Sequence, residues 1–519
     1  MHQQGAGRIP SSVLNDRHRA RCADWIAGLL ILGAACVLLL RLDGSYLWQD
    51  EAETAVLARN VLRYGYPRAF DGVHLLHVPF AAHRPGYVWV FHQWLQFYLA
   101  AASFAIFGMT TSAARLPFAV LGIASLVVAW RLTRALFDDP RIAAVSTALL
   151  SLSVPFLLHM RQCRYYAPMT LWTLCAILAY WRWLAGRRHA AWWWLTSMLL
   201  LFHSNWMASA ALLAGLGGHW LFAGGRASLP WRRAWPWVSA FGLLCAPWLL
   251  YARVWEHSAP GLTFTEVRHN LEFYVKMVNG YVVPLLGLAA AALWLRRSRP
   301  ATTPDHAALS LVGWVILATF AALLPARQHF FRYMIAIVPL LFLVAAWLLV
   351  RCLGHRPGIL VAVLVLLIGT DALHRPDRLF SGEVRSYPLD YAAELLHGSP
   401  DSVKGIIDYL NTHAAPGETV KIRYAISPLV FYTRLRVDTN AMAFFDETYP
   451  DWIVFQQGLV PDSFYESPYF ASIEARYERL DTQIPDYYWG SPPDPYLHLF
   501  RWPNDLPRVV IYHRKSGVR

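Results

Sequence analysis

Long apolar runs alternate with short polar segments through the first 371 residues of the chain. A helix needs about 20 apolar residues to cross the hydrocarbon of a bilayer. Eleven runs approach this length, at residues 24–42, 115–134, 141–159, 167–184, 191–204, 206–223, 236–253, 278–295, 307–325, 333–350 and 357–371. The pattern predicts a polytopic α-helical membrane domain with about 11 transmembrane helices over residues 24–371.

A further apolar stretch, residues 87–107, has two interpretations, because it carries His92, Gln93 and Gln96 near its start. If it does not cross, the Arg-rich short loops, such as "GRRHAA" and "RRSRPATTPDHA", fall on the side of residues 1–23. If the stretch 87–107 crosses, nearly all of these Arg-rich loops fall on the opposite side, outside the cell. Short cytoplasmic loops are enriched in Lys and Arg. We therefore predict a cytoplasmic N-terminus at 1–23 and an interfacial or re-entrant helix within a large outer loop at 43–114.

The last 148 residues, 372–519, are more polar and predict a small extracytoplasmic α/β domain. The segment "SVKGIIDYLNTHA" has the apolar spacing of a helix. The segments "TVKIRYAI", "DWIVFQQ", "YLHLFRW" and "RVVIYHR" are rich in β-branched and aromatic residues and predict strands.

Composition supports a membrane protein. Hydrophobic residues make up 56% of the chain and charged residues only 15%, which excludes a single water-soluble domain. The net charge of +13 is explained by cytoplasmic loops, and no basic, aromatic-interleaved module predicts a nucleic-acid partner. The six cysteines form no CxxC pair, so neither a disulfide framework nor a zinc ribbon is indicated. The first apolar run lacks a convincing cleavage site and predicts a retained span in a cell (inner) membrane.

The segment "WQDEAETAVLARNVLRYG" follows the first apolar run and contains adjacent acids, Asp50 and Glu51. It predicts an amphipathic helix on the outer surface that ends at Gly65. Asp50 fits an N-cap, with Glu53 three residues later as in a capping box. Asp50 therefore has two interpretations. It could only cap this helix, or it could belong to a functional site formed with the cations around it.

Outer segments far apart in the sequence carry cations where the topology predicts few. Arginine at a membrane boundary is costly unless it is paired or solvated, and guanidinium matches phosphate oxygens. For a single arginine, snorkelling to lipid headgroups or pairing with Asp50 and Glu51 is the alternative. The convergent set predicts an anionic, lipid-linked substrate. Its members are Arg59, Arg63, Arg68, Arg84, Arg161, Arg164, Arg327 and Arg332, with Tyr165, Tyr166, His83, His329 and Tyr333 beside them.

A carboxylate beside a phosphate-binding cluster has a direct chemical use. It can take the proton from an acceptor hydroxyl while that oxygen attacks a phosphate-activated carbon. The cations then stabilise the charge that develops on the departing phosphate. This chemistry predicts Asp50 as a general base.

Several segments together resemble the polytopic GT-C glycosyltransferases, in particular the bacterial branch related to protein O-mannosyltransferases and the aminoarabinose transferases of lipid A. The resemblance covers residues 24–371 and rests on "LWQDEAETAVLARNVLRYG", "HRPGYVWVFHQWL", "ARLPFAVLGIASLVVAWRLTRALF", "RQCRYYAPMTLWTLCAILAYW" and "FRYMIAIVPLLFLVAAWLL". The tail, residues 372–519, is similar to the small extracytoplasmic domain of some relatives. The family implies a sugar donor linked to polyprenyl phosphate and an inverting transfer on the outer face.

The resemblance also implies roles for single residues. Asp50 occupies the place of the family's first acid, the general base, and Glu51 is its structural or hydrogen-bonding partner. Arg84 stands where relatives often carry Lys or His before proline. The implied ligands of the donor phosphate are Arg84, Arg161, Arg164, Tyr165, Arg327 and Arg332.

The chain departs from its oligosaccharyltransferase relatives in one respect. They carry a second acidic motif in the next outer loop and use a divalent metal, whereas that loop here reads "RQCRYY". The histidines at 74, 77 and 83 lack a supporting acid at a convincing spacing. We therefore predict transfer without a metal or other cofactor. Residues with a possible role in lining the cavity are Arg59, His83, Tyr166, His203, His329 and Tyr333.

Two other functions compete with the glycosyltransferase: a transporter or flippase, and a non-catalytic binder, of a lipid-linked anionic sugar. Transporters tend to carry ionisable groups at mid-membrane and broken helices in paired halves. This chain gathers its polar groups at one surface and has no evident half-to-half similarity. The sequence leaves the sugar open, and the acceptor could be a glycolipid, a glycan or a protein.

Overall fold

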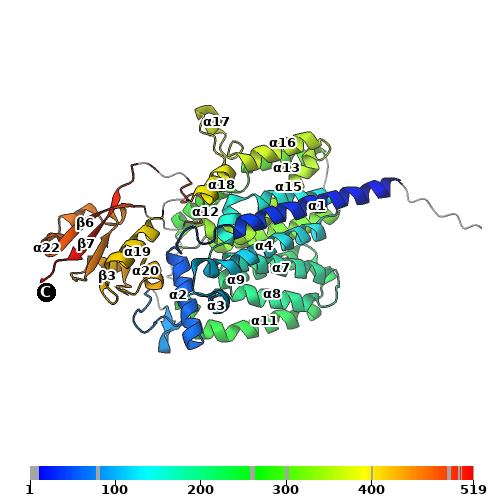
Figure 1. The fold of residues 1–519 in the computed structure, drawn as a ribbon. Helices are drawn as coiled ribbons and strands as arrows, with labels where there is room; N and C mark the ends of the chain where they lie inside the picture. Colours follow the sequence, from blue (N-terminus) through cyan, green and yellow to red (C-terminus); the bar gives the residue numbers. More distant parts are fainter. Residues whose placement is uncertain are drawn as a thin grey trace, which may run out of the picture.

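The computed structural model describes residues 11–77, 82–256, 263–298, 303–398, 401–487, 492–500, 503 and 505–517. The first ten residues of the predicted N-terminal segment therefore lie outside the described chain. Helices form a bundle that makes up most of the molecule, and a smaller domain built around a sheet lies at one end of it (Figure 1). Helix α1 runs toward the opposite end (Figure 1).

Each of the eleven predicted apolar runs lies mainly within helical structure. The helices of the bundle are α1 (Ser11–Leu39), α4 (Thr111–Leu136), α5 (Pro140–Ser151), α6 (Val154–Met160), α7 (Tyr166–Leu184), α8 (Ala190–Phe202), α9 (Trp206–Phe222), α10 (Gly225–Ser228), α11 (Trp231–Ala252), η2 (Val254–Glu256), α12 (Phe264–Tyr281), α13 (Leu285–Ser298), α14 (Thr303–Leu323), η3 (Phe331–Ile337), α15 (Val338–Leu353) and α16 (Pro357–Gly369).

Among the described helices, five are long and apolar enough to cross a membrane, or seven if each bent pair counts as one span. One bent pair is α5 and α6, which meet at 67° inside the predicted span 141–159. The other is α12 and α13, which meet at 81°. Three further apolar helices are shorter, so a total of eleven crossings stays a prediction.

Helix α12 begins well before the predicted span 278–295. The side chain of Thr263 accepts a hydrogen bond from the main chain of Glu266, and the side chain of Glu266 accepts one from the main chain of Thr263. This capping box starts a helix at Phe264, fourteen residues before the predicted span at 278. The bend then falls within the predicted span, before Leu285.

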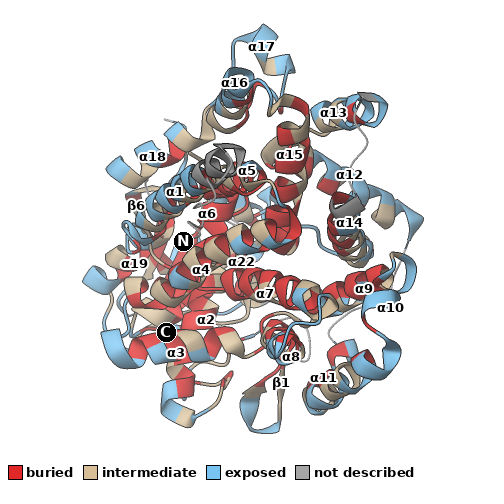
Figure 2. Cartoon of the chain, turned by 90° about the vertical axis from the view of Figure 1, so that its right-hand side faces the viewer, coloured by how far each residue is buried: buried red, intermediate tan, exposed pale blue. Residues whose placement is uncertain are grey.

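Burial follows the pattern of a membrane bundle. Buried residues gather between the helices, and exposed ones lie on their outward faces (Figure 2). Many outward residues are large and apolar, such as Trp25 at 74% exposure, Leu243 at 74% and Leu286 at 84%. Water would disfavour a continuous surface of this kind, whereas lipid tails match it. The molecule is therefore a membrane protein.

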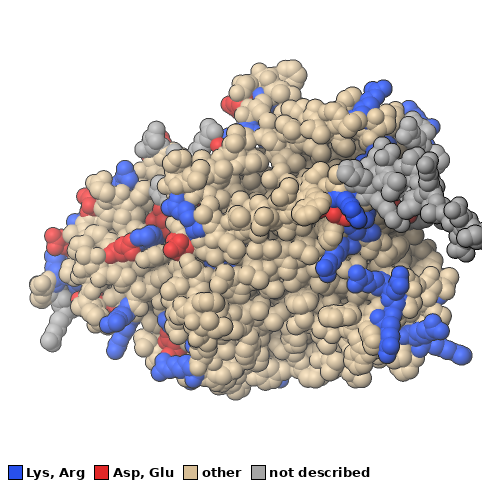
Figure 3. Space-filling view, turned by 45° about the vertical axis from the view of Figure 1, so that its right-hand side comes forward, with Lys and Arg blue, Asp and Glu red and all other residues tan. Residues whose placement is uncertain are grey.

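Charge is distributed unevenly along the bundle. Lys and Arg gather at the end remote from the sheet domain (Figure 3). The loops between helices at that end contain exposed arginines, among them Arg187, Arg188, Arg226 and Arg356. This is the distribution that the positive-inside rule predicts for the cytoplasmic end.

The opposite end of the bundle carries the predicted outer loop. Its elements are α2 (Gln49–Tyr64), β1 (His83–Arg84), η1 (Pro85–Tyr87), β2 (Val88–Trp89) and α3 (Leu95–Phe107). Helix α3 has 13 residues and is about 20 Å long, shorter than the ~30 Å of a bilayer's hydrocarbon. It packs against α2 and α4, so the stretch 87–107 is not one continuous helix.

Helix α2 begins two residues earlier than an N-cap at Asp50 predicts. Trp48 occupies the N-cap position without a side-chain cap, and Asp50 lies within the first turn. The N-cap interpretation of Asp50 is therefore wrong. The predicted end is confirmed, because Gly65 closes the helix with φ of 82°, a left-handed conformation that glycine adopts without strain.

The smaller domain contains a mixed sheet in the order β4-β3-β5-β7-β6. Strand β3 runs parallel to β4 and β5, whereas β7 runs antiparallel to β5 and β6. Its elements, with the helices that lead to it, are α17 (Asp377–Ser381), α18 (Tyr387–His397), α19 (Ser402–His413), β3 (Thr419–Ile422), α20 (Ile426–Tyr432), β4 (Arg436–Val437), η4 (Ala441–Phe445), β5 (Trp452–Phe455), η5 (Gln457–Leu459), α21 (Asp462–Tyr465), α22 (Pro468–Arg476), β6 (Tyr477–Pro485) and β7 (Arg508–Arg514).

Three of the four predicted strands match β3, β5 and β7, and the predicted helix matches α19. The fourth, "YLHLFRW", is wrong over its described residues 496–500. The main-chain oxygen of Asp494 accepts the N–H groups of Leu497 and His498, both at 3.0 Å, which makes a turn. Strand β6 occupies the edge beside β7 instead.

A buried ion pair fixes α2 across the end of the bundle. The guanidinium of Arg115 on α4 donates to both carboxylate oxygens of Glu51, at 2.9 and 2.6 Å. Glu51 is 0% exposed and also accepts the main-chain N–H of Cys163 at 2.8 Å. Arg115 further donates to main-chain oxygens of the loop before α2. One carboxylate thus connects α2, α4 and the chain after α6.

Glu51→Ala leaves the buried guanidinium of Arg115 without its counter-ion. We expect a loss of about 3–5 kcal/mol in unfolding free energy, because removing one partner of a buried pair strands the other charge. The measurement is the thermal unfolding midpoint of the purified protein in detergent. The double variant Glu51→Leu, Arg115→Met removes both charges and recovers most of that loss. A single variant as stable as the wild type would contradict the anchoring role.

Candidate active site

A cavity of about 340 Å³ lies where α2, the outer loop, the bundle end and the sheet domain meet. Its walls come from seven separate stretches of the sequence, and the sequence analysis expected some of these stretches to converge. The lining residues are Gln49, Asp50, Glu53, Leu76, His77, Phe91, His92, Arg164, Tyr165, Gln328, Arg332, Tyr333, Ile426, Ser427, Thr439 and Ala441.

Asp50 is the most accessible acid of this cavity, with a side chain 25% exposed. Its Oδ2 lies 3.4 Å from Nη2 of Arg164 and 3.7 Å from Nη1 of Arg332. Both distances exceed those of a strong charge-assisted hydrogen bond. The carboxylate of Asp50 is therefore attracted by two cations but held tightly by neither.

Glu53 and His92 belong to the same cavity, and the sequence analysis missed them as site residues. Glu53 lies one helical turn after Asp50, and its Oε1 is 3.0 Å from Nη1 of Arg164 and 3.3 Å from Nδ1 of His92. Nη2 of Arg164 lies 3.3 Å from Nε2 of His92. Because arginine can only donate, Nε2 is the acceptor and the proton of a neutral imidazole is on Nδ1, facing Glu53.

The pKa values of this pair follow from its surroundings. Burial alone would raise the pKa of Glu53, but the contact with His92 and the charge of Arg164 outweigh it and hold that pKa below its ordinary value. Burial and the charge of Arg164 lower the pKa of His92 despite the nearby carboxylates. The site therefore contains a charged Glu53 and a neutral His92 near pH 7.

The two arginines are buried against aromatic rings. The guanidinium of Arg332 lies 4.0 Å from the ring centroid of Phe330 and 5.8 Å from that of Trp48. The side chain of Arg164 is only 5% exposed, and its Nε has no hydrogen-bond partner within the described structure. Rings attract a cation without neutralising it, so both guanidinium groups keep their positive charge, and Nε of Arg164 keeps a donor for an anion.

Of the residues predicted to hold the donor phosphate, Arg164, Tyr165 and Arg332 line the cavity, together with Tyr333. Arg327 and His329 are exposed, and Gln328 between them lines the cavity instead. Tyr166 is fully buried beside His159, with ring centroids 5.3 Å apart, and is not among the lining residues.

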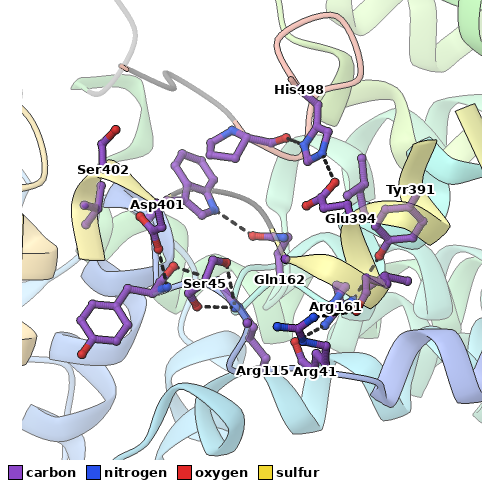
Figure 4. A pocket seen from close by; sticks show the side chains of 18 of the residues that line it. Arg41, Ser45, Arg115, Arg161, Gln162, Tyr391, Glu394, Asp401, Ser402 and His498 are labelled. Atoms are coloured by element: carbon purple, nitrogen blue, oxygen red, sulfur yellow. Dashed lines mark hydrogen bonds and ion pairs between the residues drawn. The ribbon is translucent and has the colours of Figure 1, made fainter. Parts of the chain in front are cut away.

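Arg161 lines a second, smaller cavity of about 130 Å³ (Figure 4). Its guanidinium donates to the main-chain oxygens of Leu40 and Arg41, just after α1, and to Oη of Tyr391 on α18. Trp48 and Gln162 also line this smaller cavity, and Nε1 of Trp48 donates to Gln162 at 2.8 Å. Arg161 thus binds the chain at the C-terminal end of α1 and contacts α18, and it does not line the cavity that contains Asp50.

The remaining candidates also lie outside the cavity. Arg84 donates to main-chain oxygens of α11 and pairs with Glu256 at 2.9 Å. Arg59 pairs with Asp71 at 2.9 Å. His83 lies against Tyr87, with centroids 5.6 Å apart, and His203 follows α8, where its oxygen accepts an N–H from Leu95. Glu51 is committed to Arg115. These residues shape the loops around the cavity rather than its walls.

Comparisons with known proteins show which fold this site belongs to. Residues 92–251 match a family model described as dolichyl-phosphate-mannose-protein mannosyltransferase. The structure of ArnT from Cupriavidus metallidurans in the apo state aligns over 95% of this chain and 98% of its own, with 15% identity and a TM-score of 0.60. The protein has the GT-C glycosyltransferase fold. ArnT bound to undecaprenyl phosphate aligns over 94% and 98%, with 15% identity and a TM-score of 0.57. Curated protein sequences give no match.

The expected fold class and the resemblance to GT-C glycosyltransferases are therefore confirmed. The alignment to ArnT includes the sheet domain, since it covers nearly the whole chain. The segment that matches the mannosyltransferase family contains His92, Arg164 and Tyr165 of the cavity. The roles of the individual side chains stay predictions.

Proposed function

We propose that this protein is an inverting membrane glycosyltransferase that moves a sugar from a polyprenyl-phosphate donor to an acceptor hydroxyl, with Asp50 as general base. One observation carries the proposal. Asp50 lies between the guanidinium groups of Arg164 and Arg332 in the wall of a cavity at one end of an ArnT-like bundle.

The donor phosphate is proposed to bind Arg164 and Arg332, with Tyr165 and Tyr333 beside it. Guanidinium groups bind phosphate oxygens through paired, charge-assisted hydrogen bonds, and tyrosine hydroxyls add donors. Without ligand, the two arginines face two carboxylates, those of Asp50 and Glu53. The ArnT structure bound to undecaprenyl phosphate supports a lipid donor of this kind.

Phosphate binding would also prepare the base. The phosphate competes with Asp50 for the same guanidinium groups, and the contacts of Asp50 are the longer ones, at 3.4 and 3.7 Å. Asp50 is then released toward an acceptor hydroxyl, while Glu53 stays with Arg164 at 3.0 Å. The carboxylate takes the hydroxyl proton as the oxygen attacks the anomeric carbon from the side opposite the phosphate, which inverts that carbon. The arginines stabilise the leaving phosphate.

We propose that the cavity and the sheet domain face the extracytoplasmic side of a cell (inner) membrane. The exposed arginines of the short loops lie at the other end of the bundle (Figure 3). Short loops rich in arginine stay on the cytoplasmic side, so the end that carries Asp50 belongs to the outer face. A transporter would need ionisable groups at mid-membrane, and the cavity groups lie at one end instead.

We further propose that transfer needs no metal. No three His, Cys, Asp or Glu side chains gather in a metal-binding arrangement in the part of the chain that the structure describes. More directly, the carboxylates of Asp50 and Glu53 face arginines, and a divalent cation placed there would be repelled by Arg164 and Arg332. The positive charge that a metal supplies in other enzymes comes from guanidinium groups here.

The acceptor is proposed to enter beside the sheet domain. Ile426, Ser427, Thr439 and Ala441 of that domain line the cavity. A glycolipid, a glycan or a protein hydroxyl all fit the proposed chemistry, because the base needs only a hydroxyl oxygen within reach.

Asp50→Asn removes the base but keeps the side-chain volume. We expect sugar transfer to fall by about 10² to 10⁴-fold, the range of general-base catalysis, with donor binding retained. The assay is transfer from radiolabelled polyprenyl-phosphate sugars to envelope extracts, with mass spectrometry of the products. Asp43→Asn, an exposed acid in the same loop, is the matched control. Full activity in the Asp50→Asn protein would remove the assignment.

Arg332→Ala and Arg161→Ala should affect different properties of the protein. Loss of Arg332 should weaken undecaprenyl-phosphate binding by about tenfold or more, because a charge-assisted hydrogen bond is worth about 1.5–3 kcal/mol. Loss of Arg161 should lower the thermal unfolding midpoint and leave binding by the folded protein unchanged. Binding is measured by titration in nanodiscs. Equal binding losses in both variants would show that the two cavities act as one phosphate site.

Chelation tests the metal prediction. Transfer should be unchanged after treatment with excess EDTA and removal of the chelate, because the proposed cations are arginines. The control is a parallel preparation to which Mg²⁺ or Mn²⁺ is added back. Loss of activity on chelation, with recovery on addition of either ion, would overturn the prediction.

A further inference from the structure

We propose that Asp494, from the C-terminal segment, is a positioning residue that caps the start of η3 and thereby fixes Arg332 in the phosphate site. The effect on phosphate binding rests on the proposed function. The cap itself is argued from the contacts of Asp494 alone. It gives the C-terminal segment a part in the active site, although Asp494 does not line the cavity.

Asp494 supplies a cap that the local sequence lacks. The first residue of η3 is Phe331, and the N-cap residue Phe330 has no side-chain cap. Oδ1 of Asp494 instead accepts the main-chain N–H of Arg332 at 2.9 Å. The first N–H groups of a helix have no partner within it, and a carboxylate satisfies both the hydrogen bond and the helix dipole. η3 continues directly into α15, so the cap serves the whole apolar segment from Phe331 to Leu353.

A buried histidine completes this arrangement. Nε2 of His159, on α6, lies 3.2 Å from the same Oδ1 of Asp494. Nδ1 of His159 lies 2.6 Å from the main-chain oxygen of Pro155. Both oxygens that face the imidazole can accept hydrogen bonds. Asp494 and His159 are each 0% exposed, and each supplies a polar partner to the other inside the protein.

The chain around Asp494 is held by several contacts of its own. Its main-chain oxygen closes the turn to Leu497 and His498. Nε2 of His498 lies 2.7 Å from Glu394 on α18, and the ring of Tyr496 packs on Phe273 of α12. The turn is thus anchored on both neighbouring helices. Asp494 is presented to the bundle from a rigid support.

The proposed cap matters because of Arg332. Two acids from distant parts of the chain hold this residue in position. Asp494 holds its main-chain nitrogen, and Asp50 faces its guanidinium. If the cap is lost, the first turn of η3 can fray, and the guanidinium moves with it. Displacements of about 1 Å are enough to cost much of the benefit of a positioned group.

Three variants of the full-length protein test the cap. Asp494→Ala removes the acceptor. Asp494→Asn keeps an oxygen for the N–H of Arg332 but removes the charge opposite His159. Asp486→Ala is the matched control, because Asp486 is also a buried acid of the sheet domain that accepts a main-chain N–H, from Gln457. Hydrogen exchange of residues 331–337 is followed by mass spectrometry, and undecaprenyl-phosphate binding is titrated in nanodiscs.

We expect exchange of 331–337 to accelerate by about tenfold or more in the Asp494→Ala protein, and binding to weaken by a similar factor. Asp494→Asn should keep slow exchange in 331–337 and bind within about threefold of the wild type. Asp486→Ala should match the wild type in both. If Asp494→Ala does not fold, Asp494→Ser, whose side chain is too short to reach Arg332, takes its place.

Unchanged exchange in 331–337 without the carboxylate would overturn the proposal. So would equal acceleration in the Asp486→Ala control, or an Asp494→Asn protein as impaired as the Asp494→Ala protein. If the wild type does not bind undecaprenyl phosphate at all, the proposed class of donor is wrong. The hydrogen-exchange comparison would still show whether Asp494 caps η3.

Discussion

The buried ion pair between Glu51 and Arg115 is the constraint from which the candidate site follows. Two charges removed from water must satisfy each other, and the bidentate geometry allows little freedom. This fixes α2 across the end of the bundle. Because successive residues of a helix point in directions about 100° apart, turning Glu51 into the protein turns Asp50 and Glu53 away from Arg115 and into the cavity. The adjacent acids therefore have different places: Glu51 holds the helix to the bundle, and Asp50 faces the cavity.

A similar division separates the arginines. Arg161 and Arg164 are three residues apart in the short segment after α6, yet one binds main-chain oxygens at the end of α1 and the other faces two carboxylates. The broken helix makes this possible, because the chain leaves α6 irregularly before α7 begins at Tyr166. A guanidinium can satisfy carbonyl oxygens as well as acids, so residue type alone does not reveal its partner.

The sequence predicted the bundle well because apolar length and loop charge are local signals. The sequence also placed Asp50, Arg164, Arg332 and two tyrosines at the same end of the bundle. It could do so because the charge of the short loops assigns each loop to one side of the membrane. It misjudged Glu53, which fitted a capping box, and it placed Arg84 and Arg161 with the phosphate ligands. It contained no sign of Asp494, because that residue lies in a proline-rich turn without periodicity and acts on a helix 162 residues away. Contacts of this kind depend on tertiary packing.

The contact between His159 and Asp494 spans 335 positions of the chain. Since a ribosome makes the polypeptide from its N-terminus, the bundle helices are synthesised well before the turn that carries Asp494. The arginine at the start of η3 therefore has no cap until a turn 162 residues further along the chain has been synthesised. In this protein, the final position of a cavity residue depends on a segment that is made long after it.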